Sequence, residues 1–339
     1  MEGLCRLAIA IRRNGVENIT FGCKGYLMQI DRLADLKPTS PEGCKPQNIG
    51  LAPDWLGRHF GATEPSTSRQ KSGPLRLGAI GKLEVSLTRD KREVKRLQKL
   101  RYKVFYEHRQ AVADIVTRFT RRDKDSFDGI CDHLMVVDHS ARSLIGRSLV
   151  VGTYRLLRQD VAEKHGGFYS AEEFDITSLL RRHAGLRFLE LGRSCVLPPY
   201  RAKRTIELLW HGVWRYVQDQ HIDVMIGCAS FEGTDAARLS RPLSFLHHFA
   251  RAPEAWCCDA RPFGRVEMNR ISKEEINVKA AWDELPPLIK GYLRVGAFVG
   301  DGAVFDEKLG TTDVLIIMPV SEIRARYVRY FGADARYAG

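Results

Sequence analysis

The segment Arg187–Val196 reads RFLELGRSCV and places a carboxylate inside an apolar strand. Its composition predicts a β-strand over residues 187–197, in which Glu190 stands among Phe188, Leu189 and Leu191. Burial raises the pKa of a carboxyl group toward neutrality, and this suits a general base. We therefore expect Glu190 to be catalytic, with a purely structural ion pair as the alternative.

Arg193 follows Glu190 by three positions, and in a regular strand this spacing points the two side chains to opposite faces. Gly192 lies between them, and a β-bulge at this position would re-aim one of the side chains. A bulge also frees a backbone N–H that can stabilise an oxyanion. We expect Arg193 to join Glu190 in the catalytic site, or to form a buried ion pair with it.

Upstream, apolar residues recur at helical spacing over residues 89–105, and Thr88 is the expected N-cap. Arg101 lies inside the apolar stripe that Leu97 and Phe105 mark. An unpaired buried charge is very unfavourable, so Arg101 must either find a partner or extend its head to solvent. The other basic residues of this helix are expected to form a solvated face or a docking surface.

A second charged segment, Asp123–Asp128, reads DKDSFD and puts three carboxylates within six residues. It lacks the glycine and the terminal glutamate of a calcium loop. An amine-binding loop is the sharper interpretation, and a solvated turn is the alternative.

Further strands are expected at 83–87, 133–138, 149–157, 224–229 and 314–318, and further helices at 206–218, 236–250 and 285–295. Alternating strands and helices predict an α/β or α+β domain around one sheet, and we place it at residues 81–335. Residues 1–80 are rich in turn residues and weakly periodic, which favours a flexible N-terminal extension. Met28 offers an alternative start, which would leave residues 1–27 untranslated.

The 339 residues carry a formal net charge of +12. This favours an acidic partner, either nucleic acid, an anionic membrane surface or an acidic carrier protein. The sequence has no run of 18 apolar residues and no convincing signal peptide, so we expect a cytoplasmic protein. None of the 8 cysteines forms a Cys-x-x-Cys pair, and no metal site is expected.

Four segments stand in one order along the chain: LRYKVF (100–105), DKDSFD (123–128), VVGTYRLL (150–157) and LELGRSCV (189–196). Together they resemble the acyl-homoserine-lactone synthases, which have the GCN5-related N-acyltransferase fold. This resemblance implies a mixed, mostly antiparallel sheet flanked by helices. It assigns catalysis to Glu190 and Arg193, and substrate binding to Arg101, Phe105, Asp125, Asp128 and Arg155.

Longer segments at 198–216, 226–235, 285–306 and 310–320 resemble the ornithine N-acyltransferases of ornithine-lipid synthesis, a family sometimes labelled hemolysin-like. This resemblance implies that the α-amine of L-ornithine attacks the thioester of a 3-hydroxyacyl carrier protein. The products would be a lyso-ornithine lipid and free acyl carrier protein, and no cofactor is needed. A lactone synthase is the alternative enzyme, but the tryptophan usual in that family is missing from residues 110–122.

The choice of donor depends on the segment after the central strand, which reads Arg201-Ala-Lys-Arg-Thr205. Acetyl-CoA-dependent members of the fold carry glycines here, whose backbone N–H groups cradle the pyrophosphate. Their absence disfavours CoA. We expect Arg201, Lys203 and Arg204 to hold the single phosphate of a phosphopantetheine arm, with solvated charge as the alternative.

An alternative of another class is a nucleic-acid-binding protein, which the net charge alone would allow. The sequence shows no helix-turn-helix, zinc or RNA-binding motif, so no nucleic-acid partner is expected. Because the implied product is a lipid, an anionic membrane surface is a further expected partner, with the protein peripheral to the inner face of the membrane.

Overall fold

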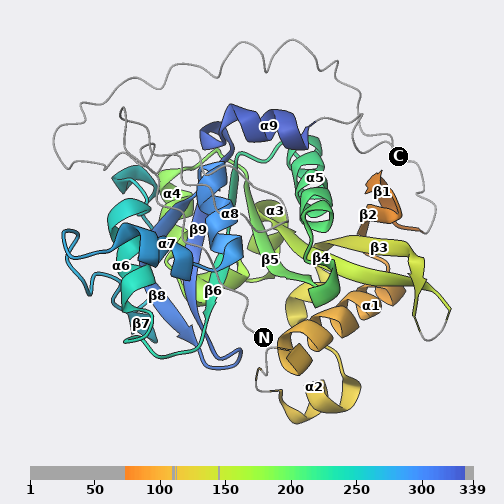
Figure 1. Cartoon of the computed structure of the whole chain (residues 1–339). Helices are drawn as coiled ribbons and strands as arrows, with labels where there is room; N and C mark the ends of the chain where they lie inside the picture. The colour runs from red at the N-terminus through yellow and green to blue at the C-terminus, as the bar shows by residue number, and fades with distance from the viewer. Residues whose placement is uncertain (1–72, 109–110, 112, 144–145, 333–339) are drawn as a thin grey trace, which may run out of the picture. The chain divides into compact units, whose positions relative to one another are not determined.

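The computed structural model describes residues 73–108, 111, 113–143 and 146–332 (Figure 1). Within them, one sheet has the strand order β1-β2-β3-β4-β5-β6-β9-β8-β7. All neighbours pair antiparallel except β5 and β6, which run parallel. The expected mostly antiparallel sheet is therefore confirmed. The strands are β1 (Leu75–Ile80), β2 (Leu83–Thr88), β3 (Asp132–Arg142), β4 (Ser148–Arg158), β5 (Phe188–Val196), β6 (Val224–Glu232), β7 (Arg265–Val266), β8 (Phe298–Asp306) and β9 (Thr311–Pro319).

Helices flank this sheet, as the resemblance implied. They are α1 (Lys91–Tyr102), α2 (Ile115–Thr120), α3 (Gln159–Ala162), α4 (Ile176–Arg182), α5 (Lys203–Asp219), α6 (Ser240–Phe249), α7 (Val278–Glu284), α8 (Pro287–Val295) and α9 (Ala325–Phe331). The π-helix is η2 (Lys103–His108), and the 3₁₀ helices are η3 (Ser126–Gly129), η4 (Glu163–His165), η5 (Tyr169–Glu172), η6 (Pro198–Tyr200), η7 (Glu254–Trp256) and η8 (Val320–Glu322). Among the described helices, none is long and apolar enough to cross a membrane.

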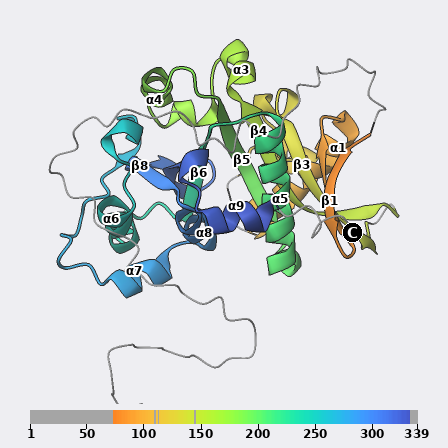
Figure 2. The ribbon, with the colours of Figure 1, turned by 90° about the horizontal axis from the view of Figure 1, so that it is seen from above.

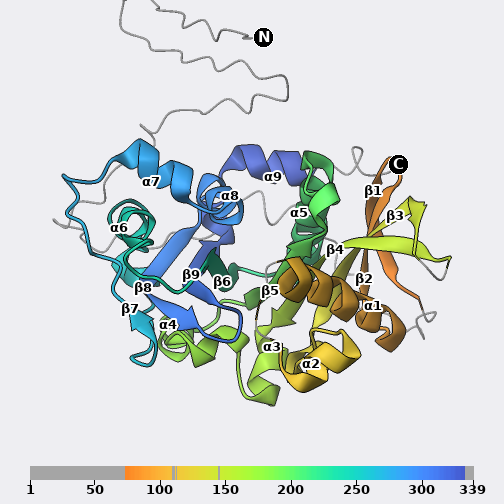
Figure 3. The same cartoon turned by 60° about the horizontal axis from the view of Figure 1, so that its bottom comes forward.

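Helix α5 packs on one face of the sheet, and α1 and α2 lie on the other (Figures 2 and 3). The approach of α5 is close because residue 212 is a glycine. A Cβ atom there would lie 3.0 Å from Val85 Cγ2 and 3.2 Å from Leu134 Cδ2. The face away from α5 carries an apolar core in which Leu157, Ile226 and Leu315 pack together with residues around η5.

The helix expected at 89–105 is present, with two differences. Its N-cap is Asp90 and not Thr88, because Asp90 Oδ1 accepts the N–H groups of Arg92 (2.8 Å) and Glu93 (3.1 Å). A carboxylate at this position also favours the positive end of the helix dipole. The α-helix ends at Tyr102 and the chain continues as the π-helix η2.

The boundary that we expected at residue 80 falls within a β-hairpin. Residues 1–72, which include Met28, lie outside the described residues, but Leu75–Ile80 form the edge strand β1. Its register with β2 runs from Leu75↔Leu87 to Ile80↔Leu83, so the two strands form a hairpin. Gly81 has a φ of +62°, which permits the tight turn. The sheet thus begins before the acyltransferase domain that we expected at 81–335.

Candidate active site

Arg101 is buried, with 1% of its side chain exposed, and two aspartates bind it. Its Nε donates to Asp123 Oδ2 (2.8 Å), and its Nη2 lies 2.8 Å from both carboxylate oxygens of Asp128. Of the two outcomes expected for Arg101, a partner or a head extended to solvent, the structure shows the first. Both partners come from the DKDSFD segment, which is therefore not a solvated turn.

Asp125 is the N-cap of the 3₁₀ helix η3 and pairs with Arg155, the second arginine of the site. Its Oδ1 accepts the N–H groups of Phe127 (3.0 Å) and Asp128 (3.2 Å), which fixes the loop. Arg155 Nη1 lies 2.6 Å from both Asp125 oxygens. Burial would raise the pKa of Asp125, but the guanidinium groups of Arg155, Arg193 and Arg101 together outweigh burial and lower this pKa to about 2.

The third arginine reaches this loop because β5 bulges where we expected. The register with β4 shifts between Arg155↔Gly192 and Thr153↔Cys195, and Arg193 has a φ of +50°. Arg193 therefore turns toward the loop, with Nη2 3.4 Å from Asp125 Oδ2 and Nε 3.6 Å from Asp123 Oδ2. A left-handed conformation is unfavourable for arginine, so its surroundings must hold it in place.

We call these six residues the Arg/Asp network: Arg101, Arg155, Arg193, Asp123, Asp125 and Asp128. It holds three guanidinium and three carboxylate groups, so its formal charges balance. The side chains expected to bind the acceptor thus already bind one another. A substrate that contacts the network has to share these partners.

Glu190 is buried and holds the neighbouring helix η5. Its Oε2 accepts the N–H of Tyr169 (2.9 Å), and its Oε1 accepts the N–H of Ser170 (2.7 Å). Burial raises the pKa of Glu190, in the direction that the sequence predicted. Because both oxygens are occupied by backbone donors, Glu190 has a structural duty that the sequence did not reveal.

The strands β5 and β6 separate directly beyond Glu190. Their parallel ladder ends at Glu190↔Ile226, whereas β5 pairs with β4 as far as Val196 and β6 pairs with β9 as far as Glu232. At the point of separation the backbones still touch. A Cβ atom on Gly227 would lie 2.3 Å from the Leu191 carbonyl oxygen, so glycine is required there.

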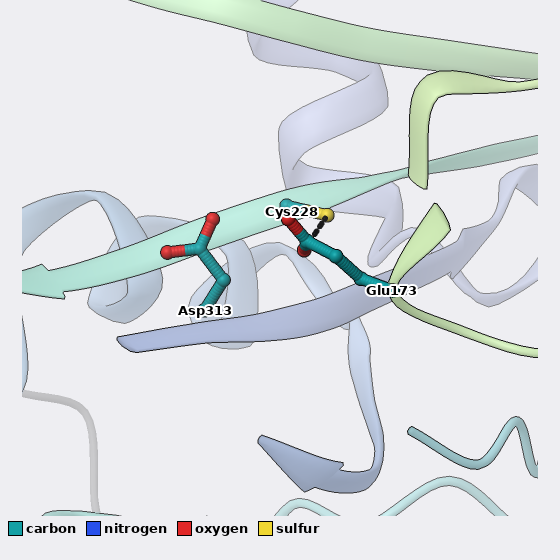
Figure 4. Close-up of side chains that lie close together, drawn as sticks. All are labelled: Glu173, Cys228 and Asp313. Atoms are coloured by element: carbon teal, nitrogen blue, oxygen red, sulfur yellow. Dashed lines mark hydrogen bonds between the residues drawn. The ribbon is translucent and has the colours of Figure 1, made fainter. Parts of the chain in front are cut away.

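Three acidic groups meet just beyond this point (Figure 4). The strand registers place Cys228 and Asp313 on the same face of the sheet as Arg155. We call Glu173, Cys228 and Asp313 the acid cluster. The Cys228 thiol donates to Glu173 Oε2 (3.3 Å), and one ligand atom from each residue lies within 4.8 Å of the others. Among the described residues, no lysine or arginine forms an ion pair with either carboxylate.

Without such a cation, the acid cluster retains protons. Burial, followed by the nearby Asp313, raises the pKa of Glu173 to about 8, and burial raises the pKa of Asp313 to about 6. Burial also raises the pKa of the Cys228 thiol well above its usual value. A metal ion would need these ligands deprotonated, so the arrangement suits proton transfer better than metal binding.

The acid cluster was not predicted from the sequence. Asp313 had a usable signal, because it precedes the apolar run Val314–Met318 much as Glu190 stands in an apolar strand. Glu173 had none, since it lies between a 3₁₀ helix and an isolated bridge. The position of Glu173 depends on η5, and Glu190 of β5 holds η5 by accepting two of its backbone N–H groups.

The remaining expected site residues lie outside both groups. Phe105 is half-buried in the π-helix η2. Arg201, Lys203 and Arg204 are exposed between η6 and the first turn of α5. Arg201 Nε donates to the Val196 carbonyl (3.2 Å), and Lys203 Nζ lies 3.4 Å from Glu207 Oε1. This basic turn therefore lies at the end of the strand that carries the bulge.

Comparison with known proteins finds a match to the part of the chain that carries the Arg/Asp network, Glu173 and Glu190. A family model described as an acetyltransferase (GNAT) domain matches residues 100–211. The chain is 52% identical over 259 residues to the L-ornithine N(alpha)-acyltransferase of Rhizobium meliloti, covering 76% of this chain and 87% of that protein. It is 50% identical over 259 residues to the protein of the same name from Brucella abortus, covering 76% and 92%.

A more distant relative has the same name. The L-ornithine N(alpha)-acyltransferase of Rhodobacter capsulatus is 40% identical over 248 residues, which cover 73% of this chain and 94% of that protein.

Solved structures are similar at a much lower level. An N-acyl amino acid synthase from uncultured soil microbes has a TM-score of 0.43 and 9% identity, covering 73% of this chain and 96% of that one. A CoA-dependent acyl-homoserine lactone synthase has a TM-score of 0.40 and 13% identity, covering 72% and 82%.

Proposed function

The chain belongs to the L-ornithine N(alpha)-acyltransferase family, and from this premise we propose that it acylates the α-amine of L-ornithine. The observation that carries the proposal is the 52% identity to a protein of that name over 76% of the chain. The donor in this proposal is a 3-hydroxyacyl thioester of acyl carrier protein, and the product is a lyso-ornithine lipid.

The reaction exchanges a thioester for an amide. The neutral α-amine attacks the carbonyl carbon, a tetrahedral oxyanion forms, and the C–S bond then breaks. The carrier leaves as a thiolate, which takes up the proton that the amine loses. The thioester is itself the activated acyl group, so the proposed reaction needs no cofactor. The protein has to bind two substrates, remove one proton and stabilise one oxyanion.

The bulge at Arg193–Ser194, directly after Gly192, is our candidate for the oxyanion site. Arg193 and Ser194 fall where the register with β4 shifts, so the regular ladder is interrupted there. The parallel ladder with β6 has also ended, at Glu190. A backbone N–H at this position has left both ladders, and the adjacent Arg193 guanidinium adds positive potential.

Two carboxylates compete for the role of base. Glu190 was the expected residue, but the N–H groups of Tyr169 and Ser170 occupy both of its oxygens. Glu173 is half-buried, carries a pKa of about 8 and accepts one weak hydrogen bond from a thiol. A base works best with a pKa near the operating pH. We therefore propose Glu173 as the base and Glu190 as the residue that positions η5 and, through it, Glu173.

The charges of L-ornithine fit the two groups of the site. Its ammonium groups suit the acid cluster, where Glu173 and Asp313 have no cationic partner among the described side chains. Its carboxylate suits Arg155 or Arg193, whose guanidinium groups can bind it while they hold Asp125. Arg101 is bound by Asp123 and Asp128, and in this proposal it acts by holding these two aspartates. We retain Phe105 as a contact to the acceptor.

For the donor, we propose that acyl carrier protein docks on the basic turn at the start of α5. Carrier proteins are acidic, and opposite charges increase the association rate until salt screens them. Lys203→Glu with Arg204→Glu should raise KM for the acyl carrier several-fold and leave kcat unchanged. The matched control reverses two exposed lysines elsewhere, Lys82 and Lys164, and should change little. Equal use of acyl-CoA, insensitive to salt, would count against carrier docking.

The proposed function is tested by offering purified protein an acyl carrier thioester and a panel of amino acids. We expect N(α)-acyl ornithine, identified by mass spectrometry and by its free side-chain amine. Acylation of a different amino acid would overturn ornithine as the acceptor. A homoserine lactone formed from S-adenosylmethionine would point to the alternative enzyme.

A further inference from the structure

Helix α2 exposes three large apolar side chains to solvent. Ile115 is 85% exposed, Val116 is 70% exposed and Phe119 is 89% exposed. The opposite side of this helix faces inward, because Thr117 is buried there. Its backbone N–H and its hydroxyl group both donate to Asp114. Three neighbouring apolar residues on one short helix form a patch, in contrast to the isolated exposed residues that are normal on a surface.

Basic side chains border this apolar patch. Arg118 and Arg121 are exposed on α2 and at its end, and Lys99 and Lys103 are exposed on the adjoining part of α1 and η2. The two elements are neighbours, since the Arg121 guanidinium lies 6.0 Å from the centre of the Tyr102 ring. Of the acidic groups nearby, Asp114 caps α2 and Glu107 pairs with Arg121. The surroundings of the patch are thus positively charged.

The patch also lies next to the candidate active site. Arg121 is the C-cap of α2, and Asp123 of the Arg/Asp network follows two residues later. Figures 1 and 3 show α2 beside the end of α1, on the face of the sheet away from α5. A molecule that covers α2 is therefore close to where the acyl product forms.

We propose that α2 is a membrane anchor whose apolar tip inserts into the interface of an anionic bilayer, while the flanking arginines and lysines contact lipid headgroups. This rests on the proposed function, because a lyso-ornithine lipid has to pass into a membrane. Apolar insertion combined with basic flanks is how interfacial helices bind anionic lipid. A bilayer yields to a protruding helix, whereas a protein partner would need a matching groove.

The test uses full-length protein and vesicles of phosphatidylcholine alone or mixed with phosphatidylglycerol, without any substrate. We expect binding to the anionic vesicles that weakens as salt increases. Phe119→Ser should weaken this binding about tenfold, because it removes a large apolar group that the bilayer would bury. Arg118→Glu should weaken binding to the anionic vesicles and leave binding to phosphatidylcholine vesicles unchanged. The matched control is Phe263→Ser, which removes a phenylalanine that is 93% exposed outside α2 and should not affect binding.

Two outcomes would overturn the proposal. One is equal vesicle binding by Phe119→Ser, Phe263→Ser and the unchanged protein. The other is a raised KM for the acyl carrier in Phe119→Ser, in solution without vesicles and with vesicle binding intact, which would make α2 a carrier surface. Vesicle binding needs no turnover, so acylation of ornithine in vesicle-free solution reports separately on the proposed function.

Discussion

The Arg/Asp network and the acid cluster lie on the same face of the sheet, but they shift the pKa values of their carboxyl groups in opposite directions. In the network each aspartate contacts at least one arginine, and the pKa of Asp125 falls to about 2. In the acid cluster the carboxylates meet each other and a thiol, and the pKa of Glu173 rises to about 8. Tyr169 lies between them, with its ring 5.0 Å from the Arg193 guanidinium.

This difference shows how one face of a sheet separates two duties. A carboxylate beside a guanidinium stays charged at any physiological pH, so it can order a loop but cannot exchange a proton. A carboxylate that is buried without a cation keeps its proton until the pH approaches neutrality, so it can act as a base. The network therefore builds the site, and the acid cluster is suited to the chemistry.

The largest expected effect comes from breaking the network at its centre. Arg101→Ala leaves Asp123 and Asp128 buried without their main partner, and should lower the free energy of unfolding by about 3–5 kcal/mol. Urea denaturation measures this effect. Lys95→Ala, on the exposed face of the same helix, is the control and should change stability little. If both variants were equally stable, the network would not support the fold.

Removing the acidic group of Glu173 should affect turnover instead. Glu173→Gln should lower kcat by about 10²–10⁴-fold, the range for a general base, with no loss of stability. In the unchanged protein kcat should rise as the pH approaches about 8, because the base must be deprotonated. This rise should disappear in Glu173→Gln.

Glu190→Gln is the matched variant for that test. Glutamine cannot accept hydrogen bonds at both positions, so η5 should loosen, and both stability and kcat should fall. The rise of kcat with pH should remain. The opposite result, a stable Glu190→Gln that has lost the pH dependence, would return the role of base to Glu190.

The two regions should also respond to pH in opposite windows. The pKa of Asp125 is lowered from 3.8 to about 2, so its contribution to stability is complete above pH 3.8 and is lost as the pH falls toward 2. Asp125→Asn should therefore be less stable than the unchanged protein at pH 7, and the difference should shrink in acid.

For Glu173 the pKa is raised from 4.5 to about 8, so the stability it allows is complete below pH 4.5 and is lost as the pH rises through 8. Glu173→Gln should match the unchanged protein at pH 4 and exceed its stability at pH 9 by about 1–3 kcal/mol, a range reduced for partial exposure. Thermal unfolding across this pH range measures both differences. If the stability differences of Asp125→Asn and Glu173→Gln from the unchanged protein varied with pH in the same way, the two regions would not respond to pH in opposite windows.

The smallest effect is expected at Cys228. Its thiol donates to Glu173 and thereby lowers the pKa of that carboxyl, against the larger effect of burial. Cys228→Ala should move the rise of kcat to higher pH by less than about one pH unit. Cys257→Ala is a control outside the cluster and should leave the profile unchanged. A shift to lower pH in Cys228→Ala would show that the thiol does not stabilise the charged carboxylate.

Much of the fold followed from local patterns. Strong periodicity at 83–87, 149–157 and 224–229 predicted β2, β4 and β6 within a few residues. Strands β1 and β8 were missed because their signals are weak. The burial of β1 is uneven, and β8 (FVGDGAVFD) is interrupted by two glycines and an aspartate. Such segments become strands because a neighbour offers them a ladder, and a single sequence does not show the neighbour.

The sequence by itself indicated that Arg101 would either find a partner or extend its head to solvent, and that Gly192 could admit a bulge, because each follows from the cost of isolated charge or from backbone geometry. It did not indicate that the aspartates of DKDSFD would be the partners of Arg101. Only the tertiary structure decided which carboxylates remain without a cation. Glu190 and Glu173 differ little as residues. Glu190 accepts hydrogen bonds from two backbone N–H groups. Glu173 lies instead beside Cys228 of β6 and Asp313 of β9. The protonation of a carboxyl group depends on what surrounds it in space, and Cys228 and Asp313 are both more than 50 residues from Glu173 in the chain.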